Sequence, residues 1–115
     1  LLHDIGIPQA EKKYGSASGE YQEIEGPPIA RRIMEEADIE EEAIEHVCQI
    51  IAHHHRGGFD TPEFYILWDA DWLVNFPDEF ASRPREETAK LINRIFKTKS
   101  GRLRAEELFL KPEKV

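Results

Sequence analysis

The chain has 115 residues, of which 40% are hydrophobic and 33% charged, with a formal net charge of −8 and one cysteine, Cys48. This length fits a single small domain with one core. The acidic balance excludes a nucleic-acid backbone binder, because phosphate contacts need clustered Lys and Arg. These residues show no signal-peptide pattern and no apolar run near the roughly 20 residues of a membrane span. A lone cysteine forms no internal disulfide, so we expect a cytoplasmic protein without a membrane partner.

The first part of the chain is predicted to be helical around one long loop. Leu1–Ile5 is typical of a helix end, stopped by Gly6 and Pro8, so we expect the rest of that helix upstream of Leu1. Residues 9–25 are polar and rich in Gly and Ser, which indicates a loop. Pro27 and Pro28 favour the start of a helix that continues through "IARRIMEEA".

The middle of the chain predicts two further helices. Asp38 followed by Glu41 resembles a capping box at the start of "IEEEAIEHVCQIIAHH", and Gly57 with Gly58 ends that helix. Thr61 is predicted to cap the next helix, with Pro62 in its first position. That helix runs through "EFYILWDADWLVNF" and ends at Pro77.

The last part predicts an amphipathic helix over "REETAKLINRIFK", a break at Ser100–Gly101, and a short helix over "RLRAEELFL". No strand-like alternation, repeat or Gly-rich phosphate loop occurs in the sequence. We therefore expect an all-α protein, a compact bundle of five or six helices. The chemistry-bearing motifs lie in residues 1–76, so 1–115 is predicted to be one domain with a helical extension over 77–115.

Helical periodicity distinguishes the two aspartates of "DADWL". At 100° per residue, Asp71 lies on the stripe that holds Phe64, Leu67 and Val74, whereas Asp69 points the other way. An ionised carboxylate on a buried stripe is costly unless it is paired or binds a metal. Asp71 is therefore either a metal ligand or a carboxylate that caps a helix or meets an arginine.

The cluster "HHH" offers a second set of ligands. Periodicity places His54 on the apolar side with Ile44 and Ile51, His55 near its margin, and His53 on the polar side. The histidines could simply complement a helix C-terminus, or bind a metal through imidazole nitrogens. His3 and Asp4 precede Gly6, and at a helix end both could reach one ion. Such a mixed N/O set suits a transition metal.

Four elements occur together in one order: "LLHDIG", "EGPPIARRIM", "IIAHHH" and "ILWDADWL". Through these four motifs in this order, residues 1–74 resemble the HD-domain superfamily of metal-dependent phosphohydrolases. The resemblance implies a helical bundle that holds a divalent metal, with Mn, Fe, Co, Ni, Zn and Mg as candidates. It assigns metal ligation to His3, Asp4 and Asp71, and it maps the family's His pair to His53 and His54.

Three features depart from the family pattern. The first His ligand of the family precedes the HD pair, and we expect it upstream of Leu1. Members with two metals carry a His four residues before the Gly that starts the "G-x-x-I/L-A" helix, and that position, before Gly26, is Gln22. The Gly-Tyr-Pro motif of cyclic dinucleotide phosphodiesterases is absent, with "RGGFDTP" in its place.

The resemblance implies hydrolysis of a phosphomonoester or phosphodiester of a small molecule, a nucleotide among the candidates. Asp4 would orient or deprotonate water, and His54 or His53 would ligate the metal or protonate the leaving oxygen. Arg56 and Lys12 are candidates for binding substrate phosphate, with solvated charge as their other interpretation.

The alternative function is a regulatory HD domain that binds metal or nucleotide without turnover. A purely structural HD-like bundle is weakened by the joint presence of His3, Asp4 and Asp71. The aromatic residues between Trp68 and Phe80 exceed what one small core needs, which leaves a homo-oligomer open.

Overall fold

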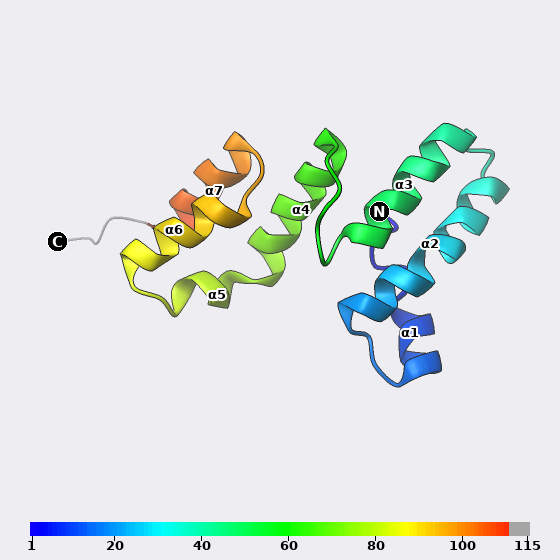
Figure 1. Cartoon of the computed structure of the whole chain (residues 1–115), viewed down its shortest axis with the longest axis horizontal. Helices are drawn as coiled ribbons and strands as arrows, with labels where there is room; N and C mark the ends of the chain where they lie inside the picture. The colour runs from blue at the N-terminus through cyan, green and yellow to red at the C-terminus, as the bar shows by residue number, and fades with distance from the viewer. Residues whose placement is uncertain (111–115) are drawn as a thin grey trace. The chain divides into compact units, whose positions relative to one another are not determined.

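The computed structural model describes residues 1–110, and every regular element in that range is an α-helix. The predicted all-α class is therefore confirmed. The helices form two compact units (Figure 1). The first unit, Leu1–Phe59, holds α1 (Ile7–Tyr14), α2 (Gly19–Glu36) and α3 (Glu41–His53). The second begins at Asp60 and holds α4 (Pro62–Asn75), α5 (Pro77–Ala81), α6 (Arg85–Ile95) and α7 (Lys99–Phe109). Within residues 1–110 the helices number seven rather than five or six.

The prediction of a loop over residues 9–25 was wrong. The structure has α1 there and the first turns of α2, separated by a short connection after Gly15. Gly15 adopts a left-handed φ of 68° and its N–H caps the carbonyl of Glu11, as expected at a helix C-terminus. The two helices are tied by the stacked rings of Tyr14 and Tyr21, 4.1 Å apart. The polar composition of residues 9–25 therefore belongs to α1 and the first turns of α2 rather than to a loop.

Two predicted helix starts also require correction. Pro27 and Pro28 lie inside α2, which begins at Gly19. Asp38 does not cap α3, because its φ is 57° and the N-cap position belongs to Glu40. The prolines and the capping-box pattern are typical of N-termini, but neither is confined to them.

The core of the first unit lies between α2 and α3. Its buried members are Ala30, Met34, Ile44, Cys48 and Ile51. Leu2 and Ile5 from the N-terminal turn pack against this cluster. Gly26 allows the close approach of the two helices, because a Cβ there would lie 2.7 Å from Cγ2 of Ile51. This packing brings the N-terminal turn, α2 and the end of α3 together.

The second unit confirms the Thr61 cap, whose side chain accepts a hydrogen bond from the N–H of Phe64 at 3.4 Å. It also confirms the amphipathic helix as α6. The break expected at Ser100–Gly101 is wrong, because both residues lie in the first turn of α7. That helix is capped by Thr98, which accepts from the N–H of Gly101 at 2.9 Å.

The aromatic residues of the second unit build its core. Phe80 and Phe96 are buried at 1% and 2% exposure, and Trp72 packs on Phe76 and Phe80. The indole N–H of Trp68 donates to the carbonyl of Ile95 at 3.1 Å. These contacts place the aromatic residues in the packing of the second unit, and the homo-oligomer stays a prediction.

The expected division between residues 76 and 77 falls inside the second unit, where α4 and α5 to α7 pack together. Positions 111–115 of the predicted extension lie outside the described residues. No helix within residues 1–110 has the length and apolar character needed to cross a membrane.

Candidate metal centre

His54, the C-cap residue of α3, is the buried polar residue at the centre of the site. Its exposure is 3%, and its ring Nδ1 lies 2.7 Å from the carbonyl oxygen of Ile51. Since a carbonyl only accepts hydrogen bonds, Nδ1 carries the proton and Nε2 of the neutral ring carries a lone pair. Nε2 is buried and has no hydrogen-bond partner among the described residues. A buried nitrogen of this kind is costly unless something else satisfies it.

Asp4 is held opposite that nitrogen by the N-terminal turn. The turn is closed by the N–H of Ile5 donating to the carbonyl of Leu2, and by the N–H of Ile7 donating to that of Asp4, both at 3.1 Å. It rests directly on α2: a Cβ on Gly6 would lie 2.8 Å from the amide nitrogen of Gly26. This contact between Gly6 and α2 holds the N-terminal turn in place. It thereby positions the Asp4 carboxylate next to His54.

The atoms that face each other across this site are both hydrogen-bond acceptors in the neutral-His state. Asp4 Oδ1 lies 3.6 Å from His54 Nε2, beyond the usual N–H···O distance. Two lone pairs at this distance repel unless a cation lies between them. Two ligands on one tetrahedral metal with bonds of about 2.1 Å lie roughly 3.4 Å apart, so the pair fits a metal. A proton on Nε2 would instead give an ion pair with the half-exposed carboxylate of Asp4.

His55 completes a group of three. One ligand atom each from Asp4, His54 and His55 lie within 4.8 Å of one another. The rings of His54 and His55 lie 3.8 Å apart, and His55 Nε2 contacts Gln22 Oε1 at 2.8 Å. Helical periodicity predicted His55 only at the margin of the apolar face. That prediction assumed that the helix continues to residue 55, whereas α3 ends at His53.

His3 lies beside this group rather than in it. Its Nε2 is 3.2 Å from Asp4 Oδ2, and its ring meets that of His54 edge-on at 5.6 Å. In this arrangement His3 orients the carboxylate, and its role as a ligand stays a prediction.

His53 points elsewhere. Its Nδ1 lies 2.8 Å from the carbonyl oxygen of Gln49, and its ring stacks on Phe59 at 5.5 Å. The periodicity prediction that His54 is the inward residue is therefore confirmed. The family mapping that also made His53 a ligand is not supported by this placement, because His53 does not join the three grouped side chains.

The buried aspartate of α4 is Asp69 and not Asp71. Asp69 is 3% exposed and accepts hydrogen bonds from the N–H groups of Lys97 and Thr98, each at 2.8 Å, and from the Thr98 hydroxyl at 2.7 Å. Asp71 is partly exposed and accepts from the side-chain amide of Asn75. The predicted stripe failed because Val74, assigned to it, is 74% exposed. The ligand role of Asp71 stays a prediction of the resemblance.

The two candidate phosphate-binding residues are both exposed. Arg56 follows the histidine cluster, and its Nε lies 3.6 Å from Glu23 Oε1 while its side chain remains 66% exposed. Lys12 lies in the last turn of α1. Their roles in substrate binding stay predictions, and Arg56 is the one that adjoins the metal group in sequence.

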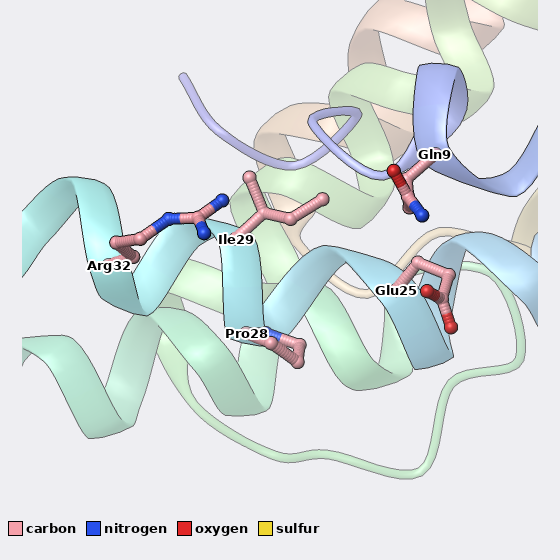
Figure 2. A pocket seen from close by; sticks show the side chains of 5 residues that line it. All are labelled: Gln9, Glu25, Pro28, Ile29 and Arg32. Atoms are coloured by element: carbon pink, nitrogen blue, oxygen red, sulfur yellow. The ribbon is translucent and has the colours of Figure 1, made fainter. Parts of the chain in front are cut away.

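A separate pocket of about 320 Å³ lies along α2, as Figure 2 shows. Glu25, Pro28, Ile29 and Arg32 line it from one face of that helix, and Gln9 closes it from α1. None of these residues belongs to the Asp–His group, so the pocket and the metal centre are distinct features of the first unit.

Comparison with protein-family models, curated proteins and solved structures gave no significant match. The geometry around His54 is therefore the basis for a functional proposal.

Proposed function

We propose that the chain is a metal-dependent phosphohydrolase of the HD-domain type, acting on a phosphate ester of a small molecule. The observation that carries the proposal is the buried Nε2 of His54, which has no hydrogen-bond partner within residues 1–110 and lies 3.6 Å from the carboxylate of Asp4. The bond from His54 Nδ1–H to Ile51 fixes the tautomer that presents Nε2, which is the outer support that metal-ligating histidines need.

Asp4 and His54 have complementary roles in this proposal. A divalent metal held there would lower the pKa of a bound water and polarise a phosphoryl oxygen. Asp4 is 49% exposed on its side chain, so water and substrate reach it from solvent. His3 Nε2 holds Asp4 Oδ2, which leaves Oδ1 turned toward His54. A carboxylate so oriented positions an attacking water and accepts its proton.

Substrate binding is assigned to the exposed cations near the site. Arg56 has a planar guanidinium that suits bidentate contact with a phosphate. Its tether to Glu23 limits its reach to the end of α3. In a chain of net charge −8, a cation at this position and a bound metal would offset the repulsion of an anionic substrate.

The experiment is a metal and activity assay on the full chain. Protein treated with chelator is titrated with Co²⁺, Mn²⁺, Ni²⁺, Zn²⁺ and Mg²⁺, then assayed on nucleotides and bis-p-nitrophenyl phosphate. We expect stoichiometric binding and metal-dependent phosphate release, both lost in Asp4→Ala and kept in His53→Ala. The absence of stoichiometric binding by every metal would contradict the proposal.

The alternative is a regulatory domain that binds metal or nucleotide without turnover. It is favoured if the metal binds at one equivalent and no phosphate ester on the panel is hydrolysed. Gln22, which stands where two-metal members carry a ligand, is the feature of this chain that motivates the alternative.

A further inference from the structure

A chain of hydrogen bonds runs from α2 to the metal group. The side-chain Nε2 of Gln22 donates to the carbonyl of Ala17 at 2.6 Å, and Gln22 Oε1 lies 2.8 Å from His55 Nε2. Gln22 is only 7% exposed, so its amide has little access to alternative partners in water. The donor and the acceptor of both hydrogen bonds are therefore fixed.

The direction follows from the carbonyl at its start. Because the Ala17 carbonyl only accepts, the amide nitrogen of Gln22 must face it, and the amide oxygen must face His55. An amide oxygen also only accepts, so His55 Nε2 carries the proton and donates it. In the neutral ring, the lone pair is then on Nδ1.

We propose that His55 Nδ1 is a metal ligand and that Gln22 is the positioning residue that selects the tautomer presenting it. This inference rests on the proposed function, since it adds a ligand to the same site. With Asp4 and His54, the set becomes two imidazole nitrogens and one carboxylate oxygen. A set with this proportion of nitrogen selects first-row transition metals over Mg²⁺ and Ca²⁺, which favour oxygen ligands.

Neighbouring residues on the same face of α2 hold His55 in place. Glu23 Oε2 accepts from the backbone N–H of His55 at 3.1 Å and from that of Arg56 at 3.2 Å. Gly19 permits the ring to approach α2, because a Cβ there would lie 2.7 Å from the Cβ of His55. Positions 19, 22 and 23 follow helical spacing, so one surface of α2 fixes both the backbone and the tautomer of His55.

The same contacts would exist if Gln22 only joined α2 to the end of α3, so the test needs a readout that such a role would not change. The ring tautomer is that readout. Long-range ¹H–¹⁵N correlation spectra of the full, metal-free chain at pH 8 report which nitrogen of His55 carries the proton. We expect the Nε2–H form in the wild-type chain and a mixture of both forms in Gln22→Leu.

Co²⁺ titration by calorimetry then links the tautomer to metal affinity. We expect about 10- to 100-fold weaker binding in Gln22→Leu, the range typical of lost outer-shell partners. Gln22→Glu keeps an acceptor for His55 Nε2–H but loses the bond donated to the Ala17 carbonyl, so it should keep the tautomer at a cost in stability. Gln49→Leu is the matched control, because the Gln49 side chain bonds only to Glu45 among the described residues. Wild-type protein should bind Co²⁺ at least about 100-fold more tightly than Mg²⁺.

His55→Ala provides a second variant that leaves the Gln22–Ala17 contact untouched, and it should lose affinity at least as strongly. An unchanged Co²⁺ affinity in His55→Ala and Gln22→Leu, with wild-type binding intact, would overturn this inference and leave the proposed function standing. Wild-type protein that binds no transition metal would overturn both.

Discussion

At the residue scale, His54 is distinguished from its neighbours by how each ring is partnered. His54 directs toward Asp4 a nitrogen that has no hydrogen-bond partner in the described part of the chain, whereas His53 turns to Gln49 and Phe59. We predict that His54→Ala lowers Co²⁺ affinity by more than 100-fold, because it removes a ligand nitrogen. His53→Ala should change the affinity by less than about threefold. Calorimetric titration of both variants measures this, and equal losses would contradict the assignment.

Asp69 predicts a stability effect without a metal effect. Asp69→Ala leaves three donors of Lys97 and Thr98 without their acceptor, and buried bonds to a charged group contribute about 1.5–3 kcal/mol each. Because water would satisfy part of this loss, we expect a decrease of about 2–4 kcal/mol in the free energy of unfolding.

Urea denaturation followed by fluorescence of Trp68 and Trp72 measures the effect. Asp71→Ala is the control for stability, since Asp71 is partly exposed and bonds within its own helix. The same pair tests the resemblance, which requires Asp71→Ala, and not Asp69→Ala, to lower metal affinity. A stability loss confined to Asp71→Ala would contradict the structural role of Asp69.

The contrast between His54 and Asp69 explains which site residues could be predicted. The apolar spacing of Ile44 and Ile51 predicts the inner face of α3, and His54 lies close enough to the helix end to follow it. On α4 most positions are apolar or aromatic, so several stripes fit the sequence equally well. The N–H groups of Lys97 and Thr98 bind Asp69 and so determine which face of α4 is buried. The periodicity of α4 alone carries no information about these distant residues.

At the element scale, the N-terminal turn is positioned by glycine. Gly6→Ala would place a Cβ 2.8 Å from the amide nitrogen of Gly26 and 2.9 Å from the carbonyl oxygen of Gln22. Both neighbours are backbone atoms of α2 and cannot rotate away. We predict a destabilisation of about 1–3 kcal/mol and weaker metal binding, because the turn that carries Asp4 must move.

Gly15→Asn is the matched control for this prediction. Gly15 has a φ of 68° but nothing within 4 Å of an added Cβ, and asparagine tolerates left-handed backbone. It should leave metal affinity unchanged. Thermal unfolding and Co²⁺ titration of the two variants decide the matter, and a Gly6→Ala protein of wild-type stability and affinity would refute the packing argument.

The helices themselves were largely predictable, whereas several of their starts were not. The strong apolar spacing of residues 41–53 and 85–95 predicted α3 and α6, and Thr61–Pro62 predicted the start of α4. The region before Pro27 has few apolar residues, so no period was visible. Its helices are instead held by contacts such as the stacked rings of Tyr14 and Tyr21 and the hydrogen bond from buried Gln22 to the carbonyl of Ala17. Helical periodicity within a single segment does not reveal contacts of this kind.

At the scale of the whole molecule, the sequence predicts one domain over residues 1–115. Each unit holds only about 50–60 residues, a size at which a single core gives marginal stability. If the chain is one domain, as the sequence predicts, it should unfold in one cooperative transition. Two probes are placed to test this, since Cys48 lies in the core of the first unit and both tryptophans lie in the second.

Metal binding should slow the reaction of Cys48 with a thiol reagent. Burial raises the pKa of the Cys48 thiol, so at pH 8 the folded chain holds less reactive thiolate than the unfolded chain, and labelling follows opening. Co²⁺ at 100 times its Kd would stabilise the folded state by about 2.7 kcal/mol, which slows labelling by about 100-fold. The tryptophan transition should shift in parallel. The His54→Ala variant should show neither the slower labelling of Cys48 nor the shift of the tryptophan transition. Protection of Cys48 without a tryptophan shift would contradict a single domain, because the two units would then unfold independently.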